Sequence, residues 1–161
     1  MHTIREAEEQ DFTGICSLFE NKDELFLIYP RGKHPFNMVQ LQEIIRTRTE
    51  LTVISDHDSI IGFANLYNFI PNTHAFIGNV IIKKMYRGQG LGKELISYML
   101  DKAFNKYNMQ EVRISVFNEN TQALLLYSQL GFIPYAREQR TNHQNNNVAL
   151  IHMKVHTHTL T

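Results

Sequence analysis

A β-rich run leads directly into a glycine-rich turn and then into a helical pattern in the stretch VIIKKMYRGQGLGKEL, residues 80–95. Glycine at every second position of the turn removes Cβ atoms, so backbone N–H groups can approach a ligand closely. The helix that follows adds unpaired N–H groups and the positive end of its dipole. Four basic residues accompany the turn: Lys83, Lys84, Arg87 and Lys93. The stretch therefore predicts an anion site suited to phosphate groups.

Two common phosphate-binding patterns do not fit this turn. The Walker pattern, G-x-x-x-x-G-K-[ST], would need its first glycine at Arg87 and its hydroxyl residue at Glu94. The dinucleotide pattern, G-x-G-x-x-G, would end at Lys93 or Leu95, depending on which glycine starts it. Both patterns fail, which argues against a nucleotide-binding or phosphotransfer protein.

The remainder of the chain predicts a mixed sheet flanked by helices. Strands are expected at 2–5, 51–55, 60–69, 74–82, 111–117, 132–137 and 148–155, and helices at 8–19, 37–46, 90–107 and 120–130. Short turns before residue 82 predict an antiparallel meander, whereas the long helix 90–107 predicts a crossover between parallel strands. Residues 21–36 are expected to be irregular because of Pro30, Gly32 and Pro35. The predicted class is α/β (α+β), with a mostly antiparallel central sheet in one domain over residues 1–161.

Two blocks of this sequence resemble the GNAT superfamily of N-acetyltransferases. The first ends in the pattern Arg-x-x-Gly-x-Gly at residues 87–92, and the second runs from Asn120-Thr121-Gln122-Ala123 through Leu126-Tyr127 to Leu130-Gly131-Phe132. The resemblance implies a GNAT-like fold and transfer of an acetyl group from acetyl-CoA (coenzyme A) to a primary amine by direct attack. A non-catalytic acyl-CoA sensor on the same fold is the alternative, although Tyr127 argues modestly against it.

The resemblance also implies which residues bind the cofactor. In the family the coenzyme A pyrophosphate lies on the backbone of the glycine turn, which here comprises Arg87, Gly88, Gln89, Gly90, Leu91 and Gly92, with Lys93 beside it. The pantetheine arm runs along the preceding strand and pairs with the main chain of Val80, Ile81 and Ile82. Asn120 matches the family's Asn before the last core helix, a position that also suits a helix N-cap.

Tyr127 matches the family's Tyr that faces the thioester sulfur, where a phenol can donate a hydrogen bond or a proton to the departing thiolate. The general base is not evident. Many family members use a Glu on the strand before the turn, but this strand has Phe76 and Gly78 there and no carboxylate. Strict alternation would place His74, the nearest titratable side chain, on one face with Phe76, Gly78, Val80 and Ile82. At about 3.3 Å per residue His74 lies roughly 20 Å from Val80, so His74 is expected at the surface and could act only through water or if the strand bends. The general base stays open between a side chain and a water relay that ends on a backbone carbonyl.

The resemblance implies that the acceptor pocket is built from the least patterned segments: the connection after the first helix, here residues 21–36, and the last two strands. The segment 21–36 contains Asp23, Glu24, Tyr29 and Arg31. Acidic and aromatic groups there would suit a cationic amine, although solvated loop residues are the more common interpretation. A polyamine, an aminoglycoside, an amino acid and a protein N-terminus all remain open as acceptors.

Composition limits the other functions. The charge is balanced, with 16 Lys plus Arg and 16 Asp plus Glu, so no nucleic-acid partner and no membrane partner are predicted. The first residues lack a signal-peptide pattern and no apolar run is long enough to span a bilayer, which predicts the cytoplasm. Oligomeric state is open, with a homodimer as one candidate.

No metal site is predicted. Cys16, the one cysteine, is expected to be a buried structural thiol. His152, His156 and His158 lie near the end of the chain without acidic or thiol ligands beside them, so a solvated tail is expected there.

Overall fold

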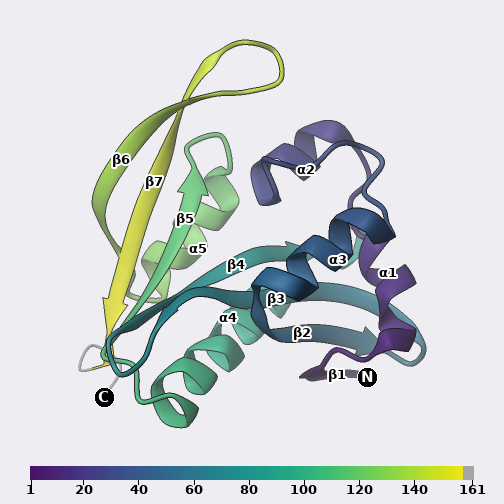
Figure 1. Ribbon diagram of the computed structural model, residues 1–161, viewed down its shortest axis with the longest axis horizontal. Coiled ribbons are helices and arrows are strands. Elements are labelled where there is room, and N and C mark those ends of the chain that lie inside the picture. Colours follow the sequence, from purple (N-terminus) through teal and green to yellow (C-terminus); the bar gives the residue numbers. More distant parts are fainter. Residues whose placement is uncertain (158–161) are drawn as a thin grey trace.

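The structure, a computed structural model, describes residues 1–157, and their strands form one seven-stranded sheet (Figure 1). The order is β1-β2-β3-β4-β5-β7-β6. Only the central pair β4–β5 is parallel, which confirms the predicted mixed, mostly antiparallel sheet. The strands are β1 (His2–Glu6), β2 (Thr49–Asp56), β3 (Ser59–Ile70), β4 (His74–Ile82), β5 (Glu111–Phe117), β6 (Ile133–Thr141) and β7 (Asn147–His156).

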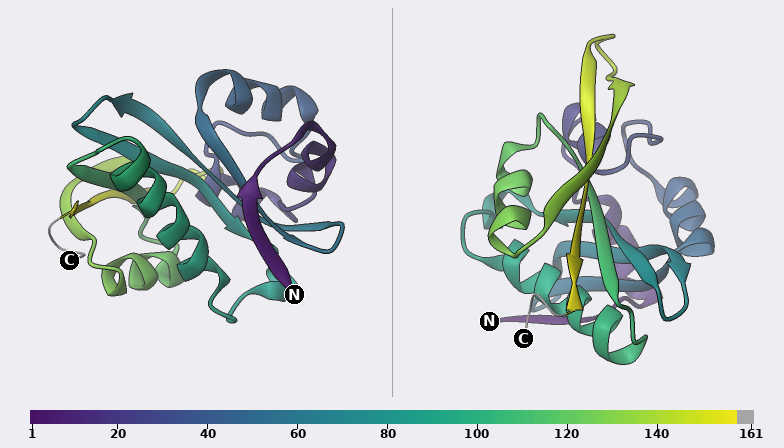
Figure 2. Two further views of the ribbon diagram at one scale, coloured as in Figure 1. Left: turned by 90° about the horizontal axis from the view of Figure 1, so that it is seen from below. Right: turned by 90° about the vertical axis from the view of Figure 1, so that its left-hand side faces the viewer.

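Helices cover both faces of the sheet (Figure 2). One face packs against α1 (Phe12–Cys16) and α3 (Met38–Thr47), and the other against α4 (Leu91–Asp101) and α5 (Thr121–Gln129). Three short turns have other helix types: the 3₁₀ turns η1 (Glu9–Asp11) and η2 (Lys84–Tyr86), and the π-helical turn η3 (Lys102–Lys106). The predicted helix 90–107 is therefore α4 continued by η3. Within residues 1–157, no helix combines the length and the apolar character needed to cross a membrane.

The N-terminal half differs from the prediction in two places. The expected helix 8–19 is divided into η1 and α1, because Asp11 bonds back to the Glu8 N–H and to Arg5. Residues 22–28, expected to be irregular, form the helix α2 (Lys22–Ile28). Its N-cap is Asn21, whose side chain accepts the Glu24 N–H at 2.8 Å, and Leu25 is buried in the core beside α1 and α3.

A β-bulge interrupts β4 at Asn79. Phe63 pairs with Ile81 but Asn65 pairs with Gly78, so three residues of β4 span the distance of two on β3. Asn79 adopts a left-handed backbone conformation with φ of 52°. The bulge reverses the side-chain alternation that follows it.

The predicted common face from His74 to Ile82 is therefore wrong. Gly78 lies on the side of Arg48 and Tyr67, and Ile81 packs into the core beside α3. Val80 and Ile82 pack against the opposite core, which contains α4.

The two parallel strands separate beyond the bulge. β4 and β5 pair only from His74 to Ile77 and from Glu111 to Ile114, although β4 continues to Ile82 and β5 to Phe117. Figure 1 shows their carboxyl ends pointing apart. Beyond Ile77 the backbone of β4 therefore makes no strand pairing with β5 among the described residues.

Candidate active site

Two cavities meet where β4 and β5 separate. One, the glycine-loop cavity, has a volume of about 560 Å³ and is lined by Gly88, Gly90 and Gly92. The other, the arginine cavity, has a volume of about 620 Å³ and is lined by Arg31, Arg48 and Arg140. Five residues border both cavities: Leu27, Ile28, Val80, Asn120 and Tyr127. A ligand in one cavity can therefore touch a ligand in the other at this junction.

The glycine-loop cavity gathers nearly all the residues predicted to bind the cofactor. Its walls include Val80, Ile81, Ile82, Arg87, Gly88, Gly90, Leu91, Gly92, Lys93 and Asn120. Gln89 does not line it.

The glycine turn presents open backbone to this cavity. Gly88 and Gly90 have φ values of 79° and 85°, and a Cβ atom added at either would meet nothing within 4 Å. Gly90 is the N-cap of α4, and the Glu94 N–H makes the first bond back to its carbonyl at 3.1 Å. The N–H groups of Leu91, Gly92 and Lys93 precede that bond and have no partner within the helix. This arrangement fits a phosphate group.

Arg87 and Glu24 form the wall between α2 and the glycine turn. The Arg87 Nε donates to the Ile82 carbonyl at 2.7 Å, and Nη2 lies 2.9 Å from Glu24 Oε2. Glu24 Oε1 is buried and has no hydrogen-bond partner among the described residues. A ligand with N–H or O–H donors would satisfy this oxygen, and the pantetheine arm of coenzyme A carries both. The residues present therefore fit the cofactor that the resemblance implies.

Tyr127 and Asn120 lie at the junction of the cavities. The Asn120 side chain accepts the Ala123 N–H at 3.4 Å, so it caps α5. The Tyr127 side chain is 5% exposed, and burial raises the pKa of its phenol. The phenol therefore keeps its proton across the neutral range and remains available as a hydrogen-bond donor.

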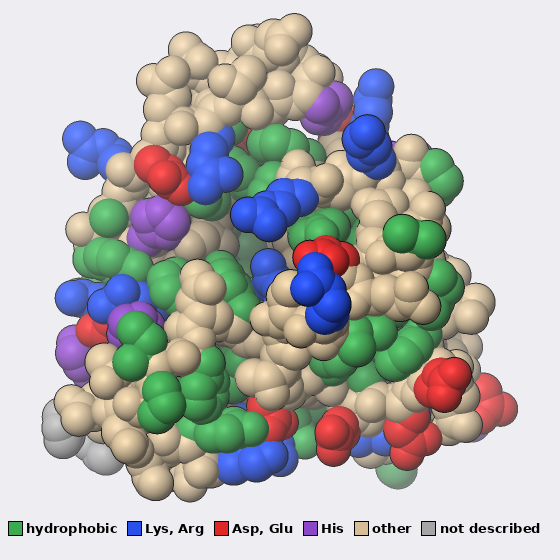
Figure 3. All heavy atoms as spheres, viewed as in Figure 1, with side chains coloured by type: hydrophobic (Ala, Val, Ile, Leu, Met, Phe, Trp, Pro, Cys, Tyr) green, Lys and Arg blue, Asp and Glu red, His purple; other side chains and the backbone are tan. Residues whose placement is uncertain are grey.

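The arginine cavity is basic and aromatic. Three arginines and the rings of Tyr67 and Phe76 contribute to its walls, and Lys and Arg side chains lie around the hollow in this face (Figure 3). The single acidic residue among its described lining residues is Glu43, which pairs with Arg46 at 2.6 Å.

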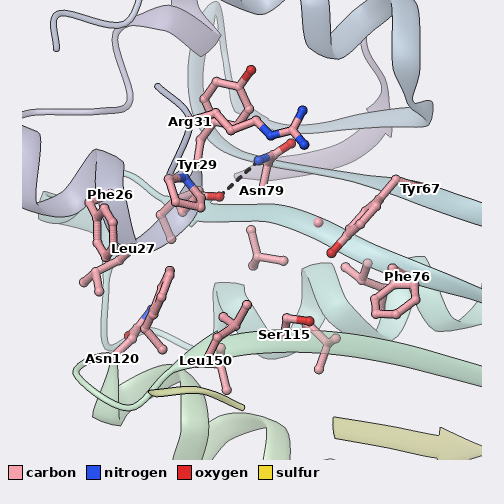
Figure 4. Close-up of a pocket in the computed structure, with 18 of the residues that line it drawn as sticks. Phe26, Leu27, Tyr29, Arg31, Tyr67, Phe76, Asn79, Ser115, Asn120 and Leu150 are labelled. Atoms are coloured by element: carbon pink, nitrogen blue, oxygen red, sulfur yellow. Dashed lines mark hydrogen bonds between the residues drawn. The ribbon is translucent and has the colours of Figure 1, made fainter. Parts of the chain in front are cut away.

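The acidic groups expected in the acceptor pocket lie elsewhere. Glu24 belongs to the glycine-loop cavity, and Asp23 pairs with His143 at 2.5 Å without lining either cavity. Tyr29 and Arg31 do line the arginine cavity, as predicted for the acceptor side (Figure 4). The part of the prediction that rests on acidic residues is wrong, because α2 turns both carboxylates away.

Ser115, which the sequence did not single out, and His152, which it placed in a solvated tail, also line the arginine cavity. The tail expectation is wrong for His152, because this residue lies within β7 and its ring contacts Ser115 of β5. Ser115 Oγ lies 2.7 Å from His152 Nδ1, and His152 Nε2 lies 3.5 Å from Glu138 Oε1. The three residues come from β5, β7 and β6, so no local motif could have indicated them. His74 lies outside both cavities, with its ring 6.1 Å from that of Phe76, and burial lowers the pKa of its imidazole.

The remaining candidate ligands do not assemble a metal site within residues 1–157. No group of three His, Cys, Asp or Glu side chains there could hold a metal ion. His156 lies 3.2 Å from Glu111, and His158 is outside the described residues. Cys16 is half-buried beside the core that includes α1, and burial raises the pKa of its thiol.

A glycine turn that fits a phosphate group, and a second cavity that adjoins it at a buried phenol, are compatible with a group-transfer enzyme. Residues 3–132 match the model of the Acetyltransferase (GNAT) family. The chain therefore belongs to this family, and it is an acetyl-CoA-dependent N-acetyltransferase, as the sequence predicts.

Individual relatives agree with this assignment. The thialysine N-epsilon-acetyltransferase of Mus musculus is 29% identical over 135 residues, which cover 81% of this chain and 75% of the relative. The spermidine N(1)-acetyltransferase of Vibrio cholerae is 25% identical over 139 residues, covering 81% and 78%. A crystal structure of spermidine N-acetyltransferase from Vibrio cholerae, in complex with CoA and spermine, superposes with a TM-score of 0.79 at 23% identity. The superposition covers 98% of this chain and 96% of that one. Because these relatives are transferases, the non-catalytic sensor is not favoured.

Proposed function

We propose that this enzyme acetylates a small-molecule primary amine that enters the arginine cavity while acetyl-CoA occupies the glycine-loop cavity. The observation that carries the proposal is the junction of the two cavities at Val80, Asn120 and Tyr127. The volume of the arginine cavity, about 620 Å³, lies in the range of small-molecule sites. Relatives named for spermidine and thialysine support a small acceptor over a peptide.

Acetyl-CoA supplies an acetyl group activated as a thioester. In this proposal the N–H groups of Leu91, Gly92 and Lys93 bind the pyrophosphate, with the open backbone of Gly88 and Gly90 beside it. From Val80 to Ile82 the backbone of β4 is not paired with β5, and there it pairs with the pantetheine arm in the manner of an added strand, while the Ile82 carbonyl keeps its bond to Arg87. Glu24 Oε1 accepts a hydrogen bond from the same arm.

Tyr127 stabilises the sulfur that leaves when the acetyl group is transferred. A thiol has an ordinary pKa of about 8.5 and a phenol of about 10, and burial raises the pKa of Tyr127 further. The phenol is then the weaker acid of the two. We therefore infer that Tyr127 donates a hydrogen bond to the developing thiolate and does not fully transfer its proton.

The attacking amine must lose a proton, and the Ser115–His152 pair is placed to receive it. Both side chains line the arginine cavity, and Glu138 Oε1 lies on the far side of the imidazole. Ser115 Oγ can pass a proton to His152 Nδ1 across their 2.7 Å contact. A water molecule would connect the amine to Ser115 if the two do not touch.

An acetyl-CoA turnover assay that measures released thiol, run across a panel of small amines and peptides, tests this function. We expect turnover with at least one small amine, and we expect that no peptide acceptor is required for turnover. Binding of acetyl-CoA without turnover of any acceptor would instead favour a sensor. The cytoplasm as compartment, a homodimer, and one domain over residues 1–161 stay predictions.

A further inference from the structure

Arg48 places a positive charge in the arginine cavity without an acidic partner. It ends α3, and its Cζ lies 4.1 Å from the centroid of the Tyr67 ring. Its Nη1 donates to Asn65 Oδ1 at 3.1 Å, which uses one of its five N–H donors. Among the ion pairs formed by residues 1–157, none includes Arg48. A largely buried charge in this state is costly unless something supplies the missing counter-charge.

The other charged groups in the cavity do not compensate Arg48. Arg31 likewise takes part in none of those ion pairs, and its positive charge adds to burial in lowering the pKa of Arg48. Arg140 is already neutralised by Glu138 at 2.6 Å, and Glu43 is already paired with the exposed Arg46. The cavity therefore keeps a positive potential that attracts an anion.

A chain of buried side-chain amides fixes Arg48 relative to the junction of the cavities. Asn65, which accepts from Arg48, donates through Nδ2 to Asn79 Oδ1 at 2.8 Å. Asn79 donates in turn to the Ile28 carbonyl at 3.1 Å, the bond drawn in Figure 4. Asn79 is the bulge residue directly before Val80. A group held by Arg48 is thus held at a set position relative to the junction.

We propose that the acceptor amine carries an oxyanion group, a carboxylate or a phosphate, which binds Arg48 while the amine points toward Val80 and Tyr127. The inference rests on the proposed function, because it names the substrate class of the same cavity. The guanidinium offers parallel N–H donors that match both kinds of oxyanion. The Tyr67 hydroxyl, which points into the cavity in Figure 4, is a second donor beside it.

Matched pairs of amines test this inference. L-lysine is compared with cadaverine, which lacks only the carboxylate, and O-phosphoethanolamine with ethanolamine, which lacks only the phosphate. We expect the native enzyme to have a higher kcat/KM for the anionic member of one pair. A preference for L-lysine would indicate a carboxylate, and a preference for O-phosphoethanolamine would indicate a phosphate. Arg48→Gln should reduce that preference by roughly ten- to a hundredfold, the usual effect of losing a charged hydrogen bond. The KM for acetyl-CoA should stay unchanged.

Lys33→Gln is the control, because it removes an exposed positive charge that lines neither cavity and takes part in none of the ion pairs formed by residues 1–157. It should leave the preference intact. If Arg48→Gln does not fold, Arg48→Lys keeps the charge, loses the parallel donors and should weaken the preference partially. Equal turnover of both members of each pair by the native enzyme would overturn the inference, and so would an equal loss for both in Arg48→Gln.

A binding measurement separates this inference from the proposed function. Calorimetry with L-lysine and with O-phosphoethanolamine is run without acetyl-CoA, on native enzyme and on Arg48→Gln. If no amine is acetylated but one of these anions binds only the native enzyme, the anion site stands and the proposed function fails. If amines are acetylated while neither anion binds differently to the two enzymes, the function stands and the anion site fails.

Discussion

Gly90→Glu tests whether the glycine turn holds the cofactor phosphates. Gly90 is the N-cap of α4 and has a φ of 85°, a conformation that costs a residue with a Cβ about 1–2 kcal/mol. A Cβ there meets nothing within 4 Å, so strain is the only steric consequence and the fold should persist. The new carboxylate then lies in the cavity where the pyrophosphate is proposed to bind.

The size of the effect follows from Coulomb's law. Two like charges about 4 Å apart repel by about 1 kcal/mol in water and about 4 kcal/mol at the effective dielectric of a protein surface. At about 1.4 kcal/mol for each tenfold change, coenzyme A should bind roughly five- to a thousandfold more weakly. Because the repulsion is electrostatic and the turn is open, the loss should shrink as the salt concentration rises.

Gly90→Ala is the matched control, since it introduces the same backbone strain without the charge. Calorimetry of coenzyme A binding is run on native enzyme and on both variants at low and high salt, with melting curves to check the fold. We expect Gly90→Ala to bind within a few-fold of the native enzyme. Native affinity in Gly90→Glu, or an equal loss in both variants, would refute the assignment of the phosphate site.

Three further variants test the other parts of the site. Tyr127→Phe keeps the packing and removes the donor, so kcat should fall by roughly ten- to a thousandfold with little change in acetyl-CoA binding; full activity would mean that another group or water stabilises the thiolate. His74→Ala should leave the pH–rate profile intact, whereas His152→Ala should lower kcat roughly ten- to a hundredfold. If both variants fold but the loss occurs in His74→Ala and not in His152→Ala, His74 is the base. Gly78→Ala would bring a Cβ within 2.6 Å of the Tyr67 ring and displace Arg48. The KM for the acceptor should therefore rise about tenfold, while the KM for acetyl-CoA should not change. A rise in both KM values would indicate a general distortion of β4.

The elements that could be predicted from the sequence are those with a long, regular pattern. Leu91, Leu95, Met99 and Ala103 repeat at helical spacing and are all buried against the sheet in α4 and η3. The strands of the meander could be predicted because each is a continuous β-rich run. Asn37 caps α3 as expected, because its side chain accepts the Gln40 N–H at 3.1 Å.

Helix α2 could not be predicted, because it is short and its stability comes from tertiary contacts. Seven residues are too few for helical periodicity to be recognised, and nearby Pro30 and Gly32 indicate irregular structure. What holds α2 is the Asn21 cap together with the burial of Leu25, and only the first of these is visible in the sequence.

Local sequence indicates the proposed cofactor side of the site, whereas most of the proposed acceptor side depends on the tertiary fold. The glycine turn is one continuous segment, so its geometry follows from local sequence. Arg48, Asn65, Ser115 and His152 come from four separate places in the chain and meet only through the order of the strands. Spacing along the sequence carries no information about such a group.

The bulge at Asn79 explains why the two cavities meet at one place. Without it, alternation would carry Gly78 and Val80 to the same face, and Val80 would point away from α4. With it, Gly78 leaves room for Arg48 and Tyr67 in the arginine cavity, and Val80, two residues later, turns toward α4. The Asn79 side chain occupies the turn between them and links Asn65 to the Ile28 carbonyl. One residue with a left-handed backbone thus joins the part of β4 that borders the glycine-loop cavity to the amides that hold Arg48. The separation of β4 from β5 begins at the same level.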